Sequence, residues 1–268
     1  MIFASIPSPS SPTIVEIGSL KLGWYGVLIA TGIALAVSIT GRQLRMRDRD
    51  SSRLGEIAIW VVALGLVGAR LYHVVTDWEL FSGHLDRLLT VQQRGLGIYG
   101  ALIGGVLGAI IGARRTGVPA AVIFDCAAPG VALAQAIGRF GNYFNQELFG
   151  GPTTLPWALE IDPANRPPAQ ASFATFHPTF LYESLWNIVV CGTLLVIARR
   201  AWGRVAAGTL FALYLALYSF GRFFVEGLRI DPAHTYGPLR LNQIVAAVVC
   251  LAACAALVIL RGRSRTTR

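Results

Sequence analysis

The segment AAPGVALAQAIGRFGNYFNQE, residues 127–147, begins as an apolar run and ends as a strongly polar one. Arg139, Asn142 and Glu147 follow the apolar run at the point where a hydrophobic helix would leave a membrane. Polar groups are expensive in lipid and usually face a cavity or a polar partner. An arginine presents planar, bidentate donors and stays charged, so Arg139 would suit a phosphate group. The alternative is a helix-end arginine that extends to the lipid headgroups and takes part in no chemistry.

The composition of the whole chain is typical of a membrane protein. Hydrophobic residues make up 54% and charged residues 14%, and the mean hydropathy is +0.57. These values indicate a polytopic membrane protein rather than a soluble one. The formal net charge is +9, but the basic residues lie in short groups between apolar segments, so we expect no nucleic-acid partner. All four cysteines lie in apolar runs without metal-ligand spacing, and the start of the chain lacks the pattern of a cleavable signal peptide.

Seven apolar segments each approach the roughly 20 residues that a helix needs to cross the hydrocarbon core. We therefore predict an all-α, polytopic membrane protein whose residues 1–268 form a single integral-membrane domain. The polar, Pro-rich segment 142–177 would form a small head outside the membrane. The predicted spans are residues 24–40, 54–75, 96–113, 120–137, 179–198, 207–225 and 243–260.

The arginines predict the orientation of these spans. Alternate connections, together with the C-terminal tail, hold five, two, three and four arginines. The positive-inside rule places these groups in the cytoplasm. The N-terminus and the head are then extracytoplasmic, and the C-terminus is cytoplasmic. The sequence has no inverted or tandem repeat of the kind that many secondary transporters contain.

This topology brings polar residues of several spans to one level, the outer half of the membrane. On the sixth span, Tyr218, Arg222, Glu226 and Arg229 follow at intervals of four, four and three residues, which places them on one helix face. Two arginines in this stripe indicate an outward-facing site for an anionic lipid. The other predicted members of the site are Tyr25, Arg70, Tyr99, Arg139, Asn142, Glu147 and His177.

Several of these residues also have a simpler interpretation. Arg222 and Glu226, four residues apart, would form an ion pair that helps their helix to insert. Arg70 would extend to the headgroups. For His177, which directly precedes a proline, we favour a structural role at a helix start. The other histidines, among them His84, have no spacing typical of a metal site.

Five stretches of the chain form a recognisable set. They are GRFGN (138–142) with Asn145 and Glu147, WYG (24–26), GAR (68–70), HPTFLYE (177–183) and YSFGRFFVEGLR (218–229). Each stretch alone would be a weak signal. In order, spacing and overall length, from about residue 20 to residue 260, the set resembles the prolipoprotein diacylglyceryl transferases.

The resemblance implies a multi-pass enzyme of the bacterial inner (plasma) membrane whose active site faces outward. Such an enzyme moves the diacylglyceryl group of phosphatidylglycerol onto the lipobox cysteine thiol of a prolipoprotein signal peptide. It forms a thioether and releases glycerol phosphate, the first step of lipoprotein maturation. Its partners would be these two substrates and the lipid bilayer, and no cofactor or metal ion is implied. Family members place the arginines that match Arg139 and Arg222 at the lipid phosphate, where they are essential, and residues that match Tyr25, Asn142, Glu147 and Glu226 are also important.

Tyr99 departs from the family pattern. Some members have His-Gly-Gly where this chain has YGA (residues 99–101), and that histidine is a proposed base. A tyrosine with a reference pKa of about 10 is a poor base at neutral pH. We keep Tyr99 among the catalytic candidates with a positioning role and assign no base. Glu147 and His177 are the nearest replacements.

Two other functions compete with the transferase. A lipid or anion transporter would use the same arginines, but it predicts an internal repeat or polar residues at the bilayer midplane. Asn187 and Thr209 are polar residues of later spans without an explanation. A structural membrane subunit would tolerate lysine at Arg139 and Arg222, because only charge and bulk would matter. Bidentate binding of a phosphate would not tolerate that change.

Overall fold

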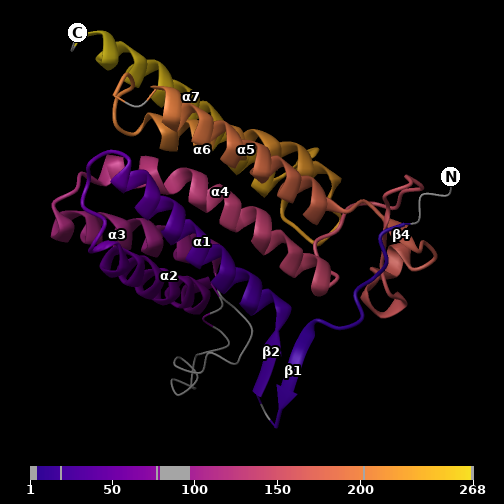
Figure 1. Ribbon diagram of the computed structural model, residues 1–268. Helices are drawn as coiled ribbons and strands as arrows, with labels where there is room; N and C mark the ends of the chain where they lie inside the picture. The colour runs from indigo at the N-terminus through magenta and orange to yellow at the C-terminus, as the bar shows by residue number, and fades with distance from the viewer. Residues whose placement is uncertain (1–4, 19, 77, 79–96, 202, 267–268) are drawn as a thin grey trace. The chain divides into compact units, whose positions relative to one another are not determined.

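Seven α-helices make up most of the computed structural model, which describes residues 5–18, 20–76, 78, 97–201 and 203–266 (Figure 1). All seven are long and apolar enough to cross a membrane. The all-α, polytopic fold class predicted from the sequence is therefore confirmed. The helices are α1 (Trp24–Arg45), α2 (Leu54–Thr76), α3 (Ile98–Thr116), α4 (Ala120–Phe144), α5 (Thr179–Ala201), α6 (Thr209–Leu228) and α7 (Leu241–Thr266).

Helix α4 continues to Phe144, past the end of the apolar segment at residue 137. The backbone N–H of Asn145 still donates to the carbonyl of Gly141, at 3.0 Å. The hydropathy of the sequence falls after residue 137, but the helical hydrogen bonds continue. The helix can continue because the polar side chains of its last turns bind other protein groups. Arg139 and Asn142 therefore lie three residues apart on one face of the last turns of the helix.

The chain forms two compact units. One contains Met1–Thr40 and Ala127–Arg268, and the other contains Gly41–Cys126. The single integral-membrane domain expected from the sequence stays a prediction.

In the unit Gly41–Cys126, helices α2 and α3 pack backbone against backbone. A Cβ atom at Gly104 would lie 2.0 Å from the carbonyl oxygen of Leu64, and one at Gly108 would lie 2.3 Å from that of Trp60. Small residues allow such close approach between membrane helices. The buried glycines of α3 recur at every fourth position: Gly100, Gly104, Gly108 and Gly112.

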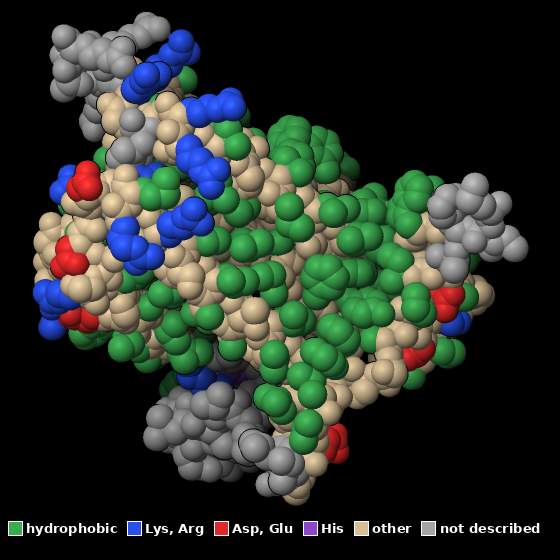
Figure 2. Space-filling model, viewed as in Figure 1, with side chains coloured by type: hydrophobic (Ala, Val, Ile, Leu, Met, Phe, Trp, Pro, Cys, Tyr) green, Lys and Arg blue, Asp and Glu red, His purple; other side chains and the backbone are tan. Residues whose placement is uncertain are grey.

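In the larger unit, buried side chains join α4, α5 and α6. The cluster consists of Ala128, Ala132, Val190, Cys191, Leu194, Ala198, Leu210 and Tyr214. The first part of α1 packs on α4 through small residues, since Cβ atoms at Gly32 and Gly130 would meet Ala134 and Ala36. On α7, the apolar side chains of Leu251 and Val258 are 71% and 73% exposed, as expected for a lipid-facing surface. Figure 2 shows hydrophobic side chains over much of the face in view and arginine side chains near the end of α7.

The head between α4 and α5 has a small apolar core of Phe149, Leu159, Ile161, Phe176 and Phe180. Strands β3 (Leu159–Glu160) and β4 (Thr175–Phe176) pair antiparallel, and two short 3-10 helices, Pro163–Asn165 and Pro168–Gln170, connect them. The N-terminal segment is attached to the head through a parallel bridge from Ile6 to Leu159.

Asp162 links three parts of this head. It accepts hydrogen bonds from the side chains of Gln146, at 2.6 Å, and Ser8, at 2.7 Å. Both bonds favour the ionised carboxylate, the one from Gln146 most, and they hold the pKa of Asp162 below its usual value.

Two further antiparallel hairpins lie at helix starts. Strands β1 (Thr13–Ile17) and β2 (Leu20–Gly23) lead into α1, and Lys21 forms an exposed ion pair with Glu16 at 3.0 Å. Strands β5 (Thr235–Tyr236) and β6 (Leu239–Arg240) lead into α7. The second hairpin matters for the site, because it ends at Arg240.

Candidate active site

Arg139, Glu183 and Arg222 meet although they come from α4, α5 and α6. Glu183 is 5% exposed. Its two carboxylate oxygens lie 2.7 Å from Arg139 Nη2 and 2.7 Å from Arg222 Nη1. Two guanidinium groups from different helices are thus directed at one small anion. Such a pair of planar, permanently charged donors is the arrangement that recognises carboxylates and phosphates.

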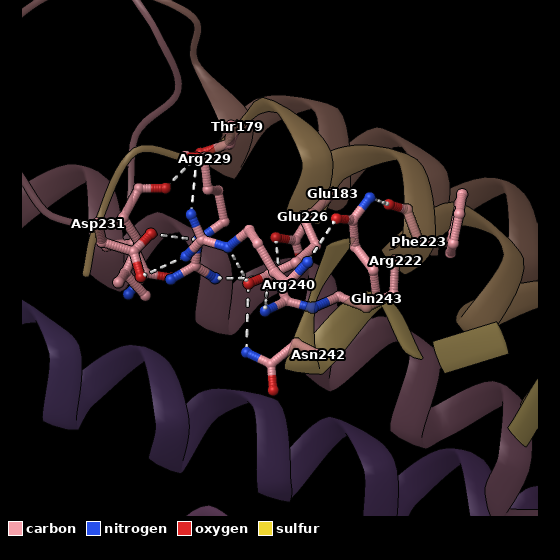
Figure 3. Close-up of polar contacts among 12 residues, drawn as sticks. Thr179, Glu183, Arg222, Phe223, Glu226, Arg229, Asp231, Arg240, Asn242 and Gln243 are labelled. Carbon is pink, nitrogen blue, oxygen red and sulfur yellow. Dashed lines mark hydrogen bonds and ion pairs between the residues drawn. The ribbon is translucent and has the colours of Figure 1, made fainter. Parts of the chain in front are cut away.

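Glu226, with no exposed surface, is the centre of a second group of contacts (Figure 3). Its carboxylate lies 2.6 Å from Arg222, 3.5 Å from Arg229, 2.9 Å from Arg240 and 3.2 Å from the amide of Asn242. A buried carboxylate is costly unless it is paired and hydrogen-bonded. Glu226 satisfies this condition and fixes one edge of Arg222.

Asp231 completes the group on the side away from Arg222. Its oxygens lie 2.7 Å from Arg229 Nε and 3.0 Å from Arg240 Nη2. Arg240 also donates to the carbonyl of Arg229, at 2.7 Å, and so holds the end of α6. Four arginines and three carboxylates take part in all these contacts, which leaves one formal positive charge.

Arg139 is the arginine of this cluster with the loosest attachment. Its side chain is 20% exposed, and its second contact, to Asn142 Oδ1, is long at 3.4 Å. Asn142 in turn donates to Glu147 Oε1 at 2.9 Å, and Asn145 donates to the same oxygen at 3.1 Å. Arg139 is therefore the member best placed to bind an incoming anion.

The chain reverses sharply after α4 to bring Glu147 back to Asn142. Gln146 and Leu148 have φ values of 49° and 59°, a left-handed conformation that is unfavourable for side chains other than glycine. The backbone N–H of Glu147 donates to the carbonyl of Asn142 at 3.1 Å. This strained turn is what positions Glu147.

Tyr25, at the start of α1, packs directly on the polar end of α4. A Cβ atom at Gly141 would lie 2.1 Å from Tyr25 Cδ2, so only glycine leaves room for this ring. The contact places Tyr25 against the residue that directly precedes Asn142 and lies two residues after Arg139. The glycine at residue 141 thus has a steric role that the sequence motif alone does not explain.

The remaining predicted residues have other surroundings. His177 Nδ1 lies 3.2 Å from Tyr182 Oη, which accepts a hydrogen bond from Trp157 at 3.1 Å. Tyr218 lies one turn before Arg222 on α6, with its ring stacked on Tyr214. His177 thus contacts an aromatic group at the head, whereas Tyr218 adjoins the arginine cluster.

Arg70 and Tyr99 belong to the unit Gly41–Cys126. Arg70 lies on α2, and the Tyr99 ring, in the first turn of α3, lies 5.8 Å from the ring of Tyr72. Their membership of the site stays a prediction, as does the positioning role of Tyr99.

The sequence does not predict four members of the cluster: Glu183, Asp231, Arg240 and Asn242. Glu183 had a usable signal, because an acidic residue inside an apolar span is expensive and usually functional. The other three lie in the connection between α6 and α7 and at the start of α7, where polar residues are ordinary. Only the folded connection brings Arg240 and Asn242 to Glu226, and Asp231 to Arg229 and Arg240.

In the described part of the chain, no group of three or more His, Cys, Asp or Glu side chains is arranged to hold a metal ion. The donors that the cluster offers are guanidinium groups, which bind anions and not cations.

The fold and the cluster together define a multi-pass membrane protein with a buried network of paired arginines and carboxylates among its helices. Residues 12–259 match the family model of prolipoprotein diacylglyceryl transferase. The chain belongs to this family, and it is therefore an enzyme of the transferase class, as the sequence predicted.

Individual relatives agree along nearly the whole chain. A phosphatidylglycerol–prolipoprotein diacylglyceryl transferase of Frankia alni is 51% identical over 264 residues, which cover 97% of this chain and 69% of the relative. The transferase numbered 2 of Streptomyces coelicolor is 47% identical over 97% of this chain and 82% of its own length. The corresponding protein of Cutibacterium acnes is 46% identical over 97% and 88%.

Proposed function

We propose that the protein transfers the diacylglyceryl group of phosphatidylglycerol to the lipobox cysteine of prolipoprotein signal peptides. The products would be a thioether-linked lipoprotein precursor and glycerol phosphate, in the first step of bacterial lipoprotein maturation. The names of the relatives support the two substrates. The observation that carries the site assignment is the pair Arg139 and Arg222, each 2.7 Å from the carboxylate of Glu183.

In this proposal the lipid phosphate binds where the two guanidinium groups converge. The cysteine sulfur attacks the glycerol carbon that bears the phosphate, a carbon–sulfur bond forms, and the carbon–oxygen bond breaks. The electron pair leaves with the phosphate oxygen, so negative charge grows on the leaving group. Fixed guanidinium groups in a site that excludes water stabilise this charge more than water could.

The thiol must lose its proton before or during the attack. A cysteine has a pKa of about 8.5 in water, and nearby positive charge lowers it. The cluster has one formal positive charge in excess, so it favours the thiolate. We assign the proton to no particular acceptor. We assign binding of the lipid to Tyr25, Arg70, Asn142, Glu147, His177, Tyr218, Glu226 and Arg229.

We place the enzyme in the bacterial inner (plasma) membrane, with the head and the arginine site toward the outer face. The last turns of α1, α3 and α5 all contain arginines: Arg42, Arg45, Arg114, Arg115, Arg199 and Arg200. The positive-inside rule then puts these helix ends in the cytoplasm. Because α5 begins at Thr179 beside the head, the head would lie outside.

The test uses a synthetic lipobox peptide, phosphatidylglycerol and the purified full chain in detergent, with mass spectrometry of the peptide. We expect the cysteine to gain the mass of one diacylglyceryl group. Arg139→Lys should lower the rate by 100-fold or more, because a lysine cannot reproduce bidentate phosphate contacts. Arg200→Lys, at the exposed end of α5, is the matched control and should keep the parent rate.

Each other result has a definite meaning. An unchanged rate with Arg139→Lys would leave the transferase in place and remove Arg139 from the phosphate site. No mass gain with the parent chain, with phosphatidylglycerol still bound, would contradict the proposed reaction. A lipid transporter or a structural subunit would then explain the arginine cluster better.

A further inference from the structure

A small cavity lies between α5 and α6, directly beside the arginine cluster. The open space here, including the adjoining solvent, is about 180 Å³, and Glu183, Asn187, Tyr218 and Arg222 contribute to its wall together with Trp186. At its centre there is room for about one water-sized group. The cavity therefore shares two residues with the proposed phosphate site and extends that site along α5.

Asn187 is the unusual member of this wall. It is 1% exposed, and its carbonyl oxygen Oδ1 accepts no hydrogen bond from the described residues. It lies eight residues after Thr179, about 12 Å along the helix at 1.5 Å per residue. Buried polar atoms at such a depth are nearly always hydrogen-bonded, because the membrane interior supplies no water to replace a missing partner. An acceptor without a donor indicates that a donor arrives from outside the chain.

Two of the neighbouring donors are already engaged. The indole N–H of Trp186 donates to the carbonyl of Leu217 at 2.8 Å. Arg222 directs its guanidinium to Glu183 and Glu226. The hydroxyl of Tyr218 can accept as well as donate. The wall therefore offers the unpaired acceptor Asn187 Oδ1 beside two groups that can donate, the Asn187 amide nitrogen and the Tyr218 hydroxyl, so the occupant should be a group that can both donate and accept a hydrogen bond.

The charges decide what kind of donor fits. A cationic ammonium group in the cavity would lie beside Arg222, and Arg139 lies on the other side of Glu183. The two arginines would repel this like charge. A carboxylate or a second phosphate would bring negative charge beside Glu183 and would leave Oδ1 without a donor. A neutral hydroxyl group satisfies the acceptors without adding charge and matches the size of the cavity.

We propose that this cavity binds a hydroxyl group of the alcohol attached to the lipid phosphate, with Asn187 Oδ1 as its acceptor. The inference rests on the proposed function, in which Arg139 and Arg222 bind the phosphate. It assigns to the Asn187 cavity the selection of a glycerol headgroup over headgroups without a free hydroxyl. Asn187 is then a specificity-determining residue, not a catalytic one.

The test compares two lipids that differ in the headgroup hydroxyls and keep the phosphodiester. Transfer to the lipobox peptide is measured with phosphatidylglycerol and with phosphatidylmethanol, which has no free hydroxyl, and kcat/KM is determined for each. We expect the parent chain to prefer phosphatidylglycerol roughly 10- to 100-fold, the effect of leaving a buried acceptor unpaired. Asn187→Leu should reduce this preference to about threefold or less, with the value for phosphatidylmethanol nearly unchanged. Ser184→Ala, a buried polar position of the same helix, is the control and should keep the preference.

Two outcomes would overturn the inference while the transferase function stands. One is equal transfer from both lipids by the parent chain. The other is an unchanged preference in Asn187→Leu, which would mean that the cavity holds only a water molecule. If Asn187→Leu does not fold, inhibition of the parent chain by glycerol phosphate and by methyl phosphate decides. We expect glycerol phosphate to inhibit at least tenfold more strongly, and equal inhibition would contradict the proposal. Failure of the parent chain to use either lipid would instead contradict the proposed function.

Discussion

The contact between Gly141 and Tyr25 makes a sharp prediction about the polar end of α4. In Gly141→Ala, the new Cβ atom would lie 2.1 Å from Tyr25 Cδ2, 2.7 Å from Cε2 and 3.0 Å from Cγ. Carbon atoms in ordinary contact are about 3.5–4.0 Å apart, so the ring must move by about 1.5 Å. Tyr25 is 42% exposed and can swing outward, so the change should displace the ring rather than unfold the helix.

The expected effect is therefore on activity. A displacement of about 1 Å in a group that positions a substrate can lower the rate by about 100-fold, so we expect Gly141→Ala to reduce kcat/KM by roughly 10- to 100-fold. Gly138→Ala is the matched control, because its Cβ would meet only the end of the Ile29 side chain, at 3.4 Å. Both substitutions exchange glycine for alanine inside the same helix and gain the same helix propensity, about 1 kcal/mol.

The assay is transfer to the lipobox peptide by both variants and the parent, with the thermal unfolding midpoint of each variant in the same detergent. Gly138→Ala should stay within about threefold of the parent rate, because its one close contact can be relieved by a flexible side chain. Equal activity of the two variants would refute the reasoning, since it would show that the site does not depend on where the Tyr25 ring lies. A loss of activity together with a large fall in the unfolding midpoint of Gly141→Ala would show that the contact supports folding instead.

Two further predictions concern stability. Gly104→Ala places a Cβ atom 2.0 Å from the Leu64 carbonyl oxygen and should lower the free energy of unfolding by about 1–3 kcal/mol. Gly105→Ala is the control and should not lower the free energy of unfolding, because its Cβ atom would lie 3.9 Å from the nearest atom. Unfolding midpoints in detergent measure both variants, and equal midpoints would contradict the backbone contact between α2 and α3. The hydrogen bond from Gln146 lowers the pKa of Asp162 in the folded protein. Ionised Asp162 therefore stabilises the head when the pH is above the pKa of an aspartate in the unfolded chain, about 3.9. This stabilisation is lost as the pH falls through the lower pKa that Asp162 has in the folded protein. As the pH falls below about 4, Asp162→Asn should therefore lose less of its resistance to pepsin than the parent does. The same dependence of pepsin resistance on pH in both proteins would contradict this linkage.

The sequence predicts the seven helices well, because hydropathy over about 20 residues is a physical requirement of the bilayer. It predicts the end of α4 less well. The apolar run stops near residue 137, yet the helix continues to Phe144, since Asn142 and Arg139 bind protein groups at the helix end. Hydropathy describes contact with lipid, so it does not detect a helix whose polar end is covered by its own fold.

The candidate site shows the same limit. The four-residue spacing on α6 predicts that Arg222 and Glu226 share a helix face, and they form an ion pair at 2.6 Å. Local periodicity cannot predict that Glu183 on α5 lies between arginines of two other helices. Nor can it predict that the β5–β6 hairpin brings Arg240 to Glu226, because contacts between distant segments depend on the complete packing.

The carboxylate of Glu183 also affects how tightly the site can hold any anion. Without it, two positive groups from α4 and α6 would repel each other whenever the site is empty. With it, a phosphate that binds at the proposed site would compete for arginines that already have a partner, so its affinity would be the difference between two sets of ion pairs. In the proposed reaction the same exchange would operate in reverse when the phosphorylated product leaves, because Glu183 would regain its contacts with Arg139 and Arg222. A residue that weakens binding in this way can shorten the residence time of the product and so speed turnover.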